Sequence, residues 1–280
     1  MPFSDASRSR SLASRKCKCN RLGAPHPDDI VMTAHPDKGH FHLKHPSGKS
    51  HEYLELPAAT RSLPASFTCS NLAAILDQGD IGSCVVNSAD FIVATQSGNK
   101  THLCRLLHYA LCRIYDDSSL DQDAGTTPRT SCEILRKYGA APESLYPYNT
   151  ANFSVLQPLN VIQRSALFSG FSYFAINPDI VSIKTALQYF NTPVTCGISV
   201  YSSFMSDAVA STGIVPLPNV STETLEGGHC ITLVGYNDAR SAFYAANSWG
   251  TSWGIRGFFY IPYAYIADSS LASDFYRIHL

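Results

Sequence analysis

The chain passes from helix-like patterns to strand-like patterns, and this order constrains the fold more than any other feature. Apolar residues recur at helical spacing over 83–97, 102–116, 128–138 and 178–190. After Phe153, short apolar runs bounded by turn residues predict strands at 194–200, around His229, just before Asn247, at 257–261 and at 274–279. We therefore expect an α+β fold with a helical half followed by a β half.

Three regions follow from the composition. Residues 1–62 are polar, show little periodicity and hold six histidines between His26 and His51, so we expect a tail and an extended arm. Residues 63–153 form the helical part, and residues 154–280 form the β-rich part. With 280 residues, 45% of them hydrophobic and 15% charged, the chain can bury a sizeable core.

The overall charge excludes two classes of partner. A formal net charge of -1 gives no general attraction to nucleic acid or to an anionic membrane. Residues 1–20 are rich in Ser and Arg and lack an apolar core, so they do not read as a secretory signal, and no apolar run approaches the length of a membrane span. The basic residues of this tail favour a solvated disordered segment over a nucleic-acid contact or a targeting signal.

Cysteine usage bears on the compartment. The nine cysteines are an odd number and show no disulfide-framework spacing. This pattern favours a reducing, intracellular compartment, and a viral protein is one of the possibilities. Three histidines, at positions 40, 42 and 45, could bind a metal, but no cysteine or carboxylate completes a known ligand spacing. We expect no metal and no cofactor.

Cys84 lies at the start of a predicted helix, where unpaired backbone N–H groups and the helix dipole favour a thiolate. The alternative is a small buried hydrophobic residue. Gln78 precedes it by six residues, with two glycines between them, so its amide can fold back beside the sulfur. Together with the Cys84 N–H, that amide could hold an oxyanion, although Gln78 read alone is a surface loop residue.

His229 and Asn247 belong to two predicted strands. His229 precedes the apolar run 231–234, and Asn247 ends the run 242–246. If the two strands are adjacent, Asn247 can accept the imidazole N–H and fix the ring, with Trp249 covering that hydrogen bond. A histidine satisfied within the core, and a Trp249 that only fills space, are the plainer readings.

These segments resemble the papain-type cysteine peptidases, the group of papain and the cathepsins. The resemblance covers residues 63–280 and is carried by Gln78 six residues before Cys84, by GGHCITLVGY (227–236), by the highly specific NSWGTSWG (247–254) and by GFFYIPYAY (257–265). It implies a helical left domain and an antiparallel, barrel-like right domain with the active-site cleft between them. It also implies an endopeptidase that works through an acyl-enzyme, with Cys84 as nucleophile, His229 as base, Asn247 as the residue that orients it, and Gln78 as oxyanion donor.

The chain departs from the usual family pattern near the nucleophile. Val85 stands where many members have Trp, and Ile81 and the segment 121–126 replace both halves of a common disulfide. This version is similar to a bacterial and large-virus branch of the family. The resemblance further implies that backbone groups of Gly125, Thr126 and Gly228 bind a peptide substrate.

Other functions remain open at this stage. The chain could be a catalytically silent peptide-binding homologue, or it could use the same thiol as a transpeptidase or an isopeptidase. Family zymogens carry a pro-segment that occupies the cleft, so the segment before Leu63 could inhibit its own enzyme and be released when its histidines are protonated. The helical sequence signature of the family's pro-segments is not visible in this segment. Substrate preference does not follow from these residues.

Overall fold

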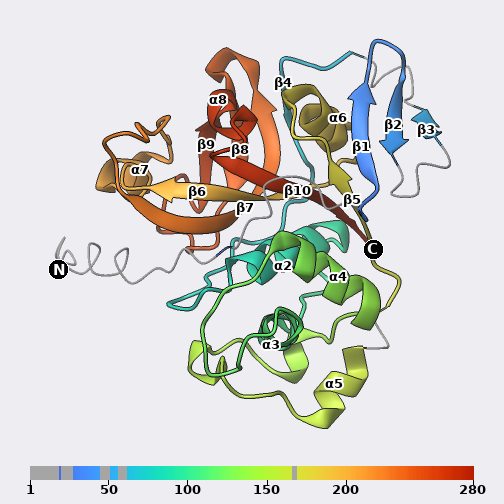
Figure 1. Cartoon of the computed structure of the whole chain (residues 1–280), viewed down its shortest axis with the longest axis vertical. Helices are drawn as coiled ribbons and strands as arrows, with labels where there is room; N and C mark the ends of the chain where they lie inside the picture. Colours follow the sequence, from blue (N-terminus) through green and yellow to red (C-terminus); the bar gives the residue numbers. More distant parts are fainter. Residues whose placement is uncertain (1–18, 20–27, 45–50, 56–61, 166–168) are drawn as a thin grey trace.

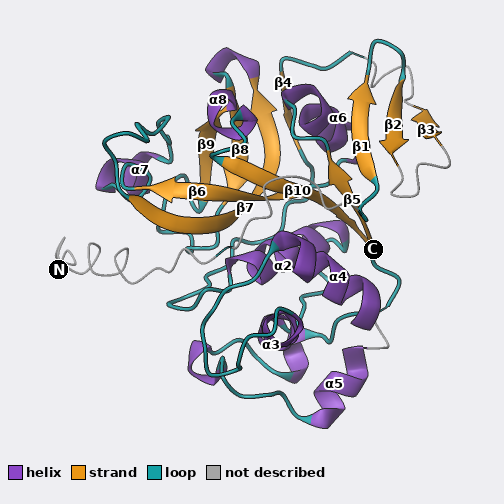
Figure 2. Ribbon diagram, in the orientation of Figure 1, coloured by secondary structure: helices purple, strands orange, loops and turns teal. Residues whose placement is uncertain are grey.

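The computed structural model describes the chain except residues 1–18, 20–27, 45–50, 56–61 and 166–168. A helical lobe and a lobe built on a large curved sheet lie against each other (Figures 1 and 2). The α-helices are α2 (Cys84–Gln96), α3 (Arg105–Tyr115), α4 (Pro128–Tyr138), α5 (Leu159–Ser165), α6 (Ile180–Phe190), α7 (Asp207–Thr212) and α8 (Tyr263–Ala267). The short 3-10 helices are η2 (Glu143–Leu145), η3 (Thr150–Asn152) and η4 (Asp238–Arg240).

The strands are β1 (Val31–His35), β2 (His40–Lys44), β3 (His51–Glu55), β4 (Ser66–Thr68), β5 (Ser172–Ile176), β6 (Val194–Tyr201), β7 (Leu225–Asn237), β8 (Ala242–Ala246), β9 (Phe258–Pro262) and β10 (Ala272–His279). In the described residues they form one sheet of order β3-β2-β1-β5-β10-β6-β7-β8-β9, with β4 paired to β7. The two ends of this order do not pair, so the expected barrel-like domain is an open sheet rather than a closed barrel.

The helical lobe follows its sequence signals closely. Thr127 caps α4 by accepting the Thr130 N–H at 2.9 Å, Pro128 occupies the first turn, and Gly139 ends the helix at a φ of 68°. Residues 84–95 of α2 are all buried, because this helix packs against α3 and α4 on one side and against β6, β7 and β10 on the other. A helix buried on every side forms the junction between the lobes.

The N-terminal region contributes more structure than an extended arm. Strands β1 and β2 form an antiparallel hairpin, β3 adds to its outer edge, and β1 pairs in parallel with β5. Met32 and Phe41, from β1 and β2, are 2% and 0% exposed and belong to the core of the sheet lobe. These strands are therefore an integral part of the sheet.

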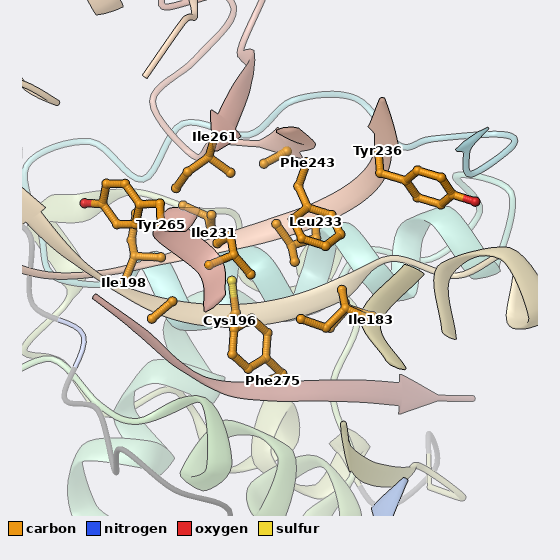
Figure 3. Close-up of a cluster of buried hydrophobic side chains, with 14 of the residues drawn as sticks. Ile183, Cys196, Ile198, Ile231, Leu233, Tyr236, Phe243, Ile261, Tyr265 and Phe275 are labelled. Atoms are coloured by element: carbon orange, nitrogen blue, oxygen red, sulfur yellow. The ribbon is translucent and has the colours of Figure 1, made fainter. Parts of the chain in front are cut away.

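The main core lies between the sheet and the helices that cover it. Figure 3 shows part of it, where apolar side chains from β6, β7, β8, β9, β10, α6 and α8 meet. A second core joins the helical lobe to the sheet, where Ile92 of α2 and Leu135 of α4 pack in one cluster with Ala175 of β5 and with Tyr276 and Ile278 of β10. The two lobes are therefore held together partly by apolar packing between the helices and the sheet. None of the helices described by the structure is both long and apolar enough to cross a bilayer.

Candidate active site

Cys84 is the first residue of α2, as the sequence predicts, and its side chain is fully buried. Ser83 precedes it as the N-cap residue, but no side-chain cap bond is made there. The Ser83 hydroxyl instead lies 2.7 Å from the Tyr148 hydroxyl, and Tyr148 donates to the Gln78 carbonyl at 2.9 Å. The turn before the helix is thus fixed by a tyrosine from a distant loop.

Gln78 lies on the same turn and reaches across to the other lobe. Its Nε2 donates to the Ile81 carbonyl at 2.8 Å, and its Oε1 accepts the Ser248 hydroxyl at 2.7 Å. Its backbone N–H donates to the Ser248 carbonyl at 2.8 Å. These bonds hold the Gln78 amide in one orientation between the turn before Cys84 and the segment that follows β8.

A polar cross-link occupies the region where many family members have a disulfide. The Asp123 carboxylate accepts the Gly82 N–H at 2.8 Å and the Tyr109 hydroxyl at 2.7 Å. Tyr109 in turn accepts the Gly125 N–H at 3.0 Å. Sequence reasoning missed Asp123, Tyr109 and Tyr148, because only the fold brings these residues to the turn.

His229 and Asn247 meet as the paired-strand prediction requires. Strand β7 pairs with β8 antiparallel, with Thr232 opposite Ala246, and this pairing brings Asn247 within hydrogen-bonding reach of His229. The His229 Nε2 is 2.8 Å from the Asn247 Oδ1. Asn247 Oδ1 also accepts the Ser248 backbone N–H at 2.8 Å, which fixes this atom as the oxygen. Nε2 must therefore be the protonated ring nitrogen, and Nδ1 is the nitrogen that can exchange a proton.

Aromatic side chains enclose the imidazole. Trp249 is 0% exposed and stacks on His229 with ring centroids 4.8 Å apart and an interplanar angle of 29°. Phe204 packs edge-on against both rings, and Trp253 stacks on Phe204. Trp249 therefore lies where the sequence argument needs it, over the His229–Asn247 pair and away from water.

The two walls meet where α2 packs on β7. Cys84 and Val85 of α2 belong to one buried apolar cluster with Cys230, the residue that follows His229. The fourth member of that cluster is Cys19, from the N-terminal segment. The thiol, the imidazole strand and the N-terminal segment thus converge on one closed site.

Cys19 lies between the residues that the resemblance assigns to substrate binding. Its N–H donates to the Gly228 carbonyl at 2.8 Å, and it forms a parallel bridge with Thr126. A Cβ at Gly228 would lie 1.9 Å from the Cys19 oxygen, so only glycine allows this approach. The Gly125 N–H is bonded to Tyr109, which makes Thr126 the residue of that pair that faces Cys19.

The cysteines of the helical lobe differ from those of the cleft. Burial raises the pKa of Cys104 to about 11 and the pKa of Cys112 and Cys132 well above the ordinary value for a thiol. Burial also raises the pKa of Cys69, beneath the sheet, to about 12. These four thiols remain protonated at neutral pH and read as core residues.

No metal site was found in the part of the chain that the structure describes. Of the three histidines considered as ligands, His40 and His42 lie in β2, while His45 falls outside the described residues. The basic residues of the tail also fall outside them.

Comparison with known proteins identifies the family. Residues 63–276 match the family described as papain family cysteine protease. The chain belongs to the papain family of cysteine proteases. It is therefore a hydrolase of the cysteine peptidase type, and the papain-like fold and family predicted from the sequence are confirmed.

The chain is similar to individual members of the papain family, one of them from a large virus. It is 35% identical over 216 residues to an uncharacterized peptidase C1-like protein of Acanthamoeba polyphaga mimivirus, covering 72% of this chain and 68% of that protein. Xylellain, a cysteine protease from Xylella fastidiosa, superposes with a TM-score of 0.77 at 24% identity, covering 94% and 96% of the two chains. The digestive procathepsin L2 proteinase of Tenebrio molitor larval midgut superposes with a TM-score of 0.66 at 19% identity, covering 97% and 80%.

Proposed function

We propose that this papain-family protease cleaves peptide bonds through Cys84, His229, Asn247 and Gln78, by way of an acyl-enzyme, and that its own N-terminal segment blocks the cleft. The hydrogen bond from His229 Nε2 to Asn247 Oδ1 carries the proposal. It sets the tautomer and ring plane of His229, so Nδ1 can take the proton of a thiol. Cys84 lies at the N-terminus of the helix that packs on the same strand.

In the proposed reaction the Cys84 thiol gives its proton to His229 Nδ1, and the thiolate attacks the carbonyl carbon of the scissile bond. The oxyanion is held by the second Nε2 hydrogen of Gln78 and by the Cys84 backbone N–H. Protonated His229 then passes its proton to the leaving amine. In the second half, His229 takes a proton from water, the hydroxide attacks the thioester, and Cys84 is released with its proton restored.

Thr126 and Gly228, the two edges of the proposed groove, support binding of an extended peptide. Both residues already pair through their backbone with Cys19. Backbone pairing of this kind holds a substrate regardless of its side chains, so the pockets beside the groove are left to select among sequences.

The same contacts support an inhibitory role for the N-terminal segment. Cys84, His229 and Gln78 are each 0% exposed while Cys19 occupies the groove. Downstream of Cys19 the segment is anchored at Asp29, whose carboxylate accepts from Arg129 at 3.0 Å and from the Tyr276 hydroxyl at 2.8 Å. A similar fold occurs in a procathepsin. Release by protonation of the segment's histidines stays a prediction, which the rate of cleavage below about pH 6.5 tests.

Replacing the nucleophile tests the proposed reaction. Cys84→Ala should lower kcat/KM for an unstructured protein substrate by about 10⁴-fold or more, because no other group can form the thioester. Cys112→Ala is the matched control, since Cys112 is also a fully buried thiol but lies in α3. It should stay within a few-fold of the parent.

Cleavage by Cys84→Ala at the parental rate would show that the assignment is wrong. The products decide whether water is the acceptor. Hydrolysis gives a free carboxylate even when an amine is added, whereas a transpeptidase joins the acyl group to that amine.

A further inference from the structure

Two thiols from distant parts of the sequence are in contact inside the cleft. Cys19 and Cys230 pack in one buried cluster with Cys84 and Val85, and they are 5% and 1% exposed. The backbone holds them there, because the Cys19 N–H donates to the Gly228 carbonyl at 2.8 Å and Gly228 is two residues from Cys230 on β7. Residues two apart in a strand point to the same face, so Cys230 points to the side on which Cys19 lies.

The surroundings of Cys230 favour its thiolate. The Thr195 hydroxyl lies 3.1 Å from its Sγ. Burial alone would raise the pKa of Cys230, but hydrogen bonds from Cys19, Thr195 and Ser88 outweigh it and lower that pKa below the ordinary value. The pKa of Cys19 is raised, first by its hydrogen bond to Cys230 and then by burial. Of the two thiols, Cys230 is therefore the one that loses its proton more readily, and a thiolate beside a thiol is the arrangement that oxidation to a disulfide needs.

We propose that Cys19 and Cys230 form an oxidative modification site, at which a peroxide converts the two thiols into a disulfide that ties the N-terminal segment to β7. The Cys230 thiolate attacks one oxygen of the peroxide and becomes a sulfenic acid. The other oxygen departs as hydroxide and is protonated to water. Cys19 sulfur then displaces that oxygen as a second water. Two thiols lose two hydrogens and two electrons, and one hydrogen peroxide becomes two waters.

The disulfide changes the inhibitory contact from reversible to covalent. A reduced segment leaves the groove whenever its hydrogen bonds open, whereas a tethered segment stays at a high effective concentration beside Thr126 and Gly228. Oxidation therefore locks the protease closed, and a thiol reductant unlocks it. This consequence rests on the proposed function of the segment, but the formation of the disulfide does not.

Peptide mapping of the full chain tests the site itself. The experiment uses the Cys84→Ala chain, because this substitution removes the competing thiol. The protein is reduced, treated with a few equivalents of hydrogen peroxide, alkylated, and digested without reductant. We expect the peptides that contain Cys19 and Cys230 to be joined, two hydrogens lighter than their sum, and to separate on reduction. Cys230→Ser in this background should abolish the joined species, while Cys132→Ser, a change at a buried thiol outside the pair, should leave it. Recovery of alkylated Cys19, or its linkage to another cysteine, would overturn the proposal.

Activity tests the consequence. Peroxide should lower the activity of the full chain at least 10-fold, with recovery on reduction, and the Cys84 peptide should be recovered as an unoxidised thiol. In Cys19→Ser the ratio of reduced to oxidised activity should fall below about 2-fold. An equal loss in Cys19→Ser, or an oxidised Cys84 in the parent, would show that the nucleophile itself is the target and would overturn the lock. If the reduced full chain has no activity under any condition, the proposed function fails instead. Peptide mapping still shows whether the Cys19–Cys230 disulfide forms.

Discussion

The two walls of the cleft are built in different ways. On the helical wall, directional polar bonds hold the turn before Cys84, through Asp123, Tyr109 and Tyr148. Behind it, Arg105 forms two 2.6 Å contacts with Glu143. On the β wall, His229 is held by strand pairing and by a stack of aromatic rings around Trp249 and Phe204.

This difference teaches where each wall is vulnerable. A polar cross-link depends on a few atoms, so single substitutions or a change of protonation can loosen it without disturbing the core. An aromatic enclosure depends on volume and burial, so a change there affects the free energy of unfolding and the site together. Substitutions in the aromatic wall should therefore cost more stability than substitutions in the polar wall.

Trp249→Ala should have the largest effect on stability. It removes a fully buried ring and should lower the free energy of unfolding by about 4 kcal/mol, as other large aromatic truncations do. Denaturant unfolding measures this. The matched pair Trp249→Phe and Trp253→Phe then separates packing from shielding, since only Trp249 stacks on His229. Trp249→Phe should lower kcat more than Trp253→Phe, and equal kcat values would contradict the shielding role.

His108 gives the helical lobe a dependence on pH. It is buried between α3 and α4, where its Nε2 donates to the Ser131 carbonyl at 3.1 Å, and burial lowers its pKa from 6.5 to about 4. The unfolded chain binds a proton at His108 more tightly than the folded chain does. The contribution of neutral His108 to the free energy of unfolding is therefore complete above about pH 6.5 and is lost as the pH falls toward 4. The loss amounts to about 3 kcal/mol.

His108→Gln, which cannot be protonated, isolates that contribution. Between pH 7 and pH 4 the free energy of unfolding of the parent should fall by about 3 kcal/mol more than that of the variant. Parallel curves for the two proteins would show that His108 does not titrate differently on folding.

Asp123→Ala tests the polar cross-link. It leaves the Gly82 N–H and the Tyr109 hydroxyl without their acceptor and should lower the free energy of unfolding by about 2 kcal/mol. The turn before Cys84 loosens with it, so kcat should fall as well. Asp121→Ala, two residues away and exposed, is the control and should change neither. Equal behaviour of the two variants would mean that Asp123 does not support the turn.

Much of the fold could be predicted from local patterns. The helix-like stretches ending at Gln96, Tyr115, Tyr138 and Phe190 are confirmed, because their apolar spacing and stop signals are local. The strand of His229 and the strand before Asn247 were predicted to be neighbours, and they pair. Strands β1 to β3 were missed, since short segments that alternate apolar residues with histidine become strands only by adding to the edge at β5.

The candidate site divides in the same way. Gln78, Cys84, His229 and Asn247 could be singled out from sequence, since they stand in motifs of fixed spacing. Asp123, Tyr109 and Ser248 could not be given a role, because each acts through a partner that only the fold brings near. Cys19 was hidden for the same reason, as its position in the groove depends on Thr126 and Gly228.

Selective alkylation of Cys84 tests the central claim most directly. The form to use begins at Asp28, which keeps Asp29 and the strands β1 to β3 while removing the proposed inhibitory segment. At pH 5.5, iodoacetamide should label Cys84 at least 100-fold faster than any other cysteine of this form, and faster than it labels Cys84 in the reduced full chain. His229→Ala should abolish the preference. Uniform slow labelling of all thiols, unchanged by His229→Ala or by removal of the segment, would contradict the account.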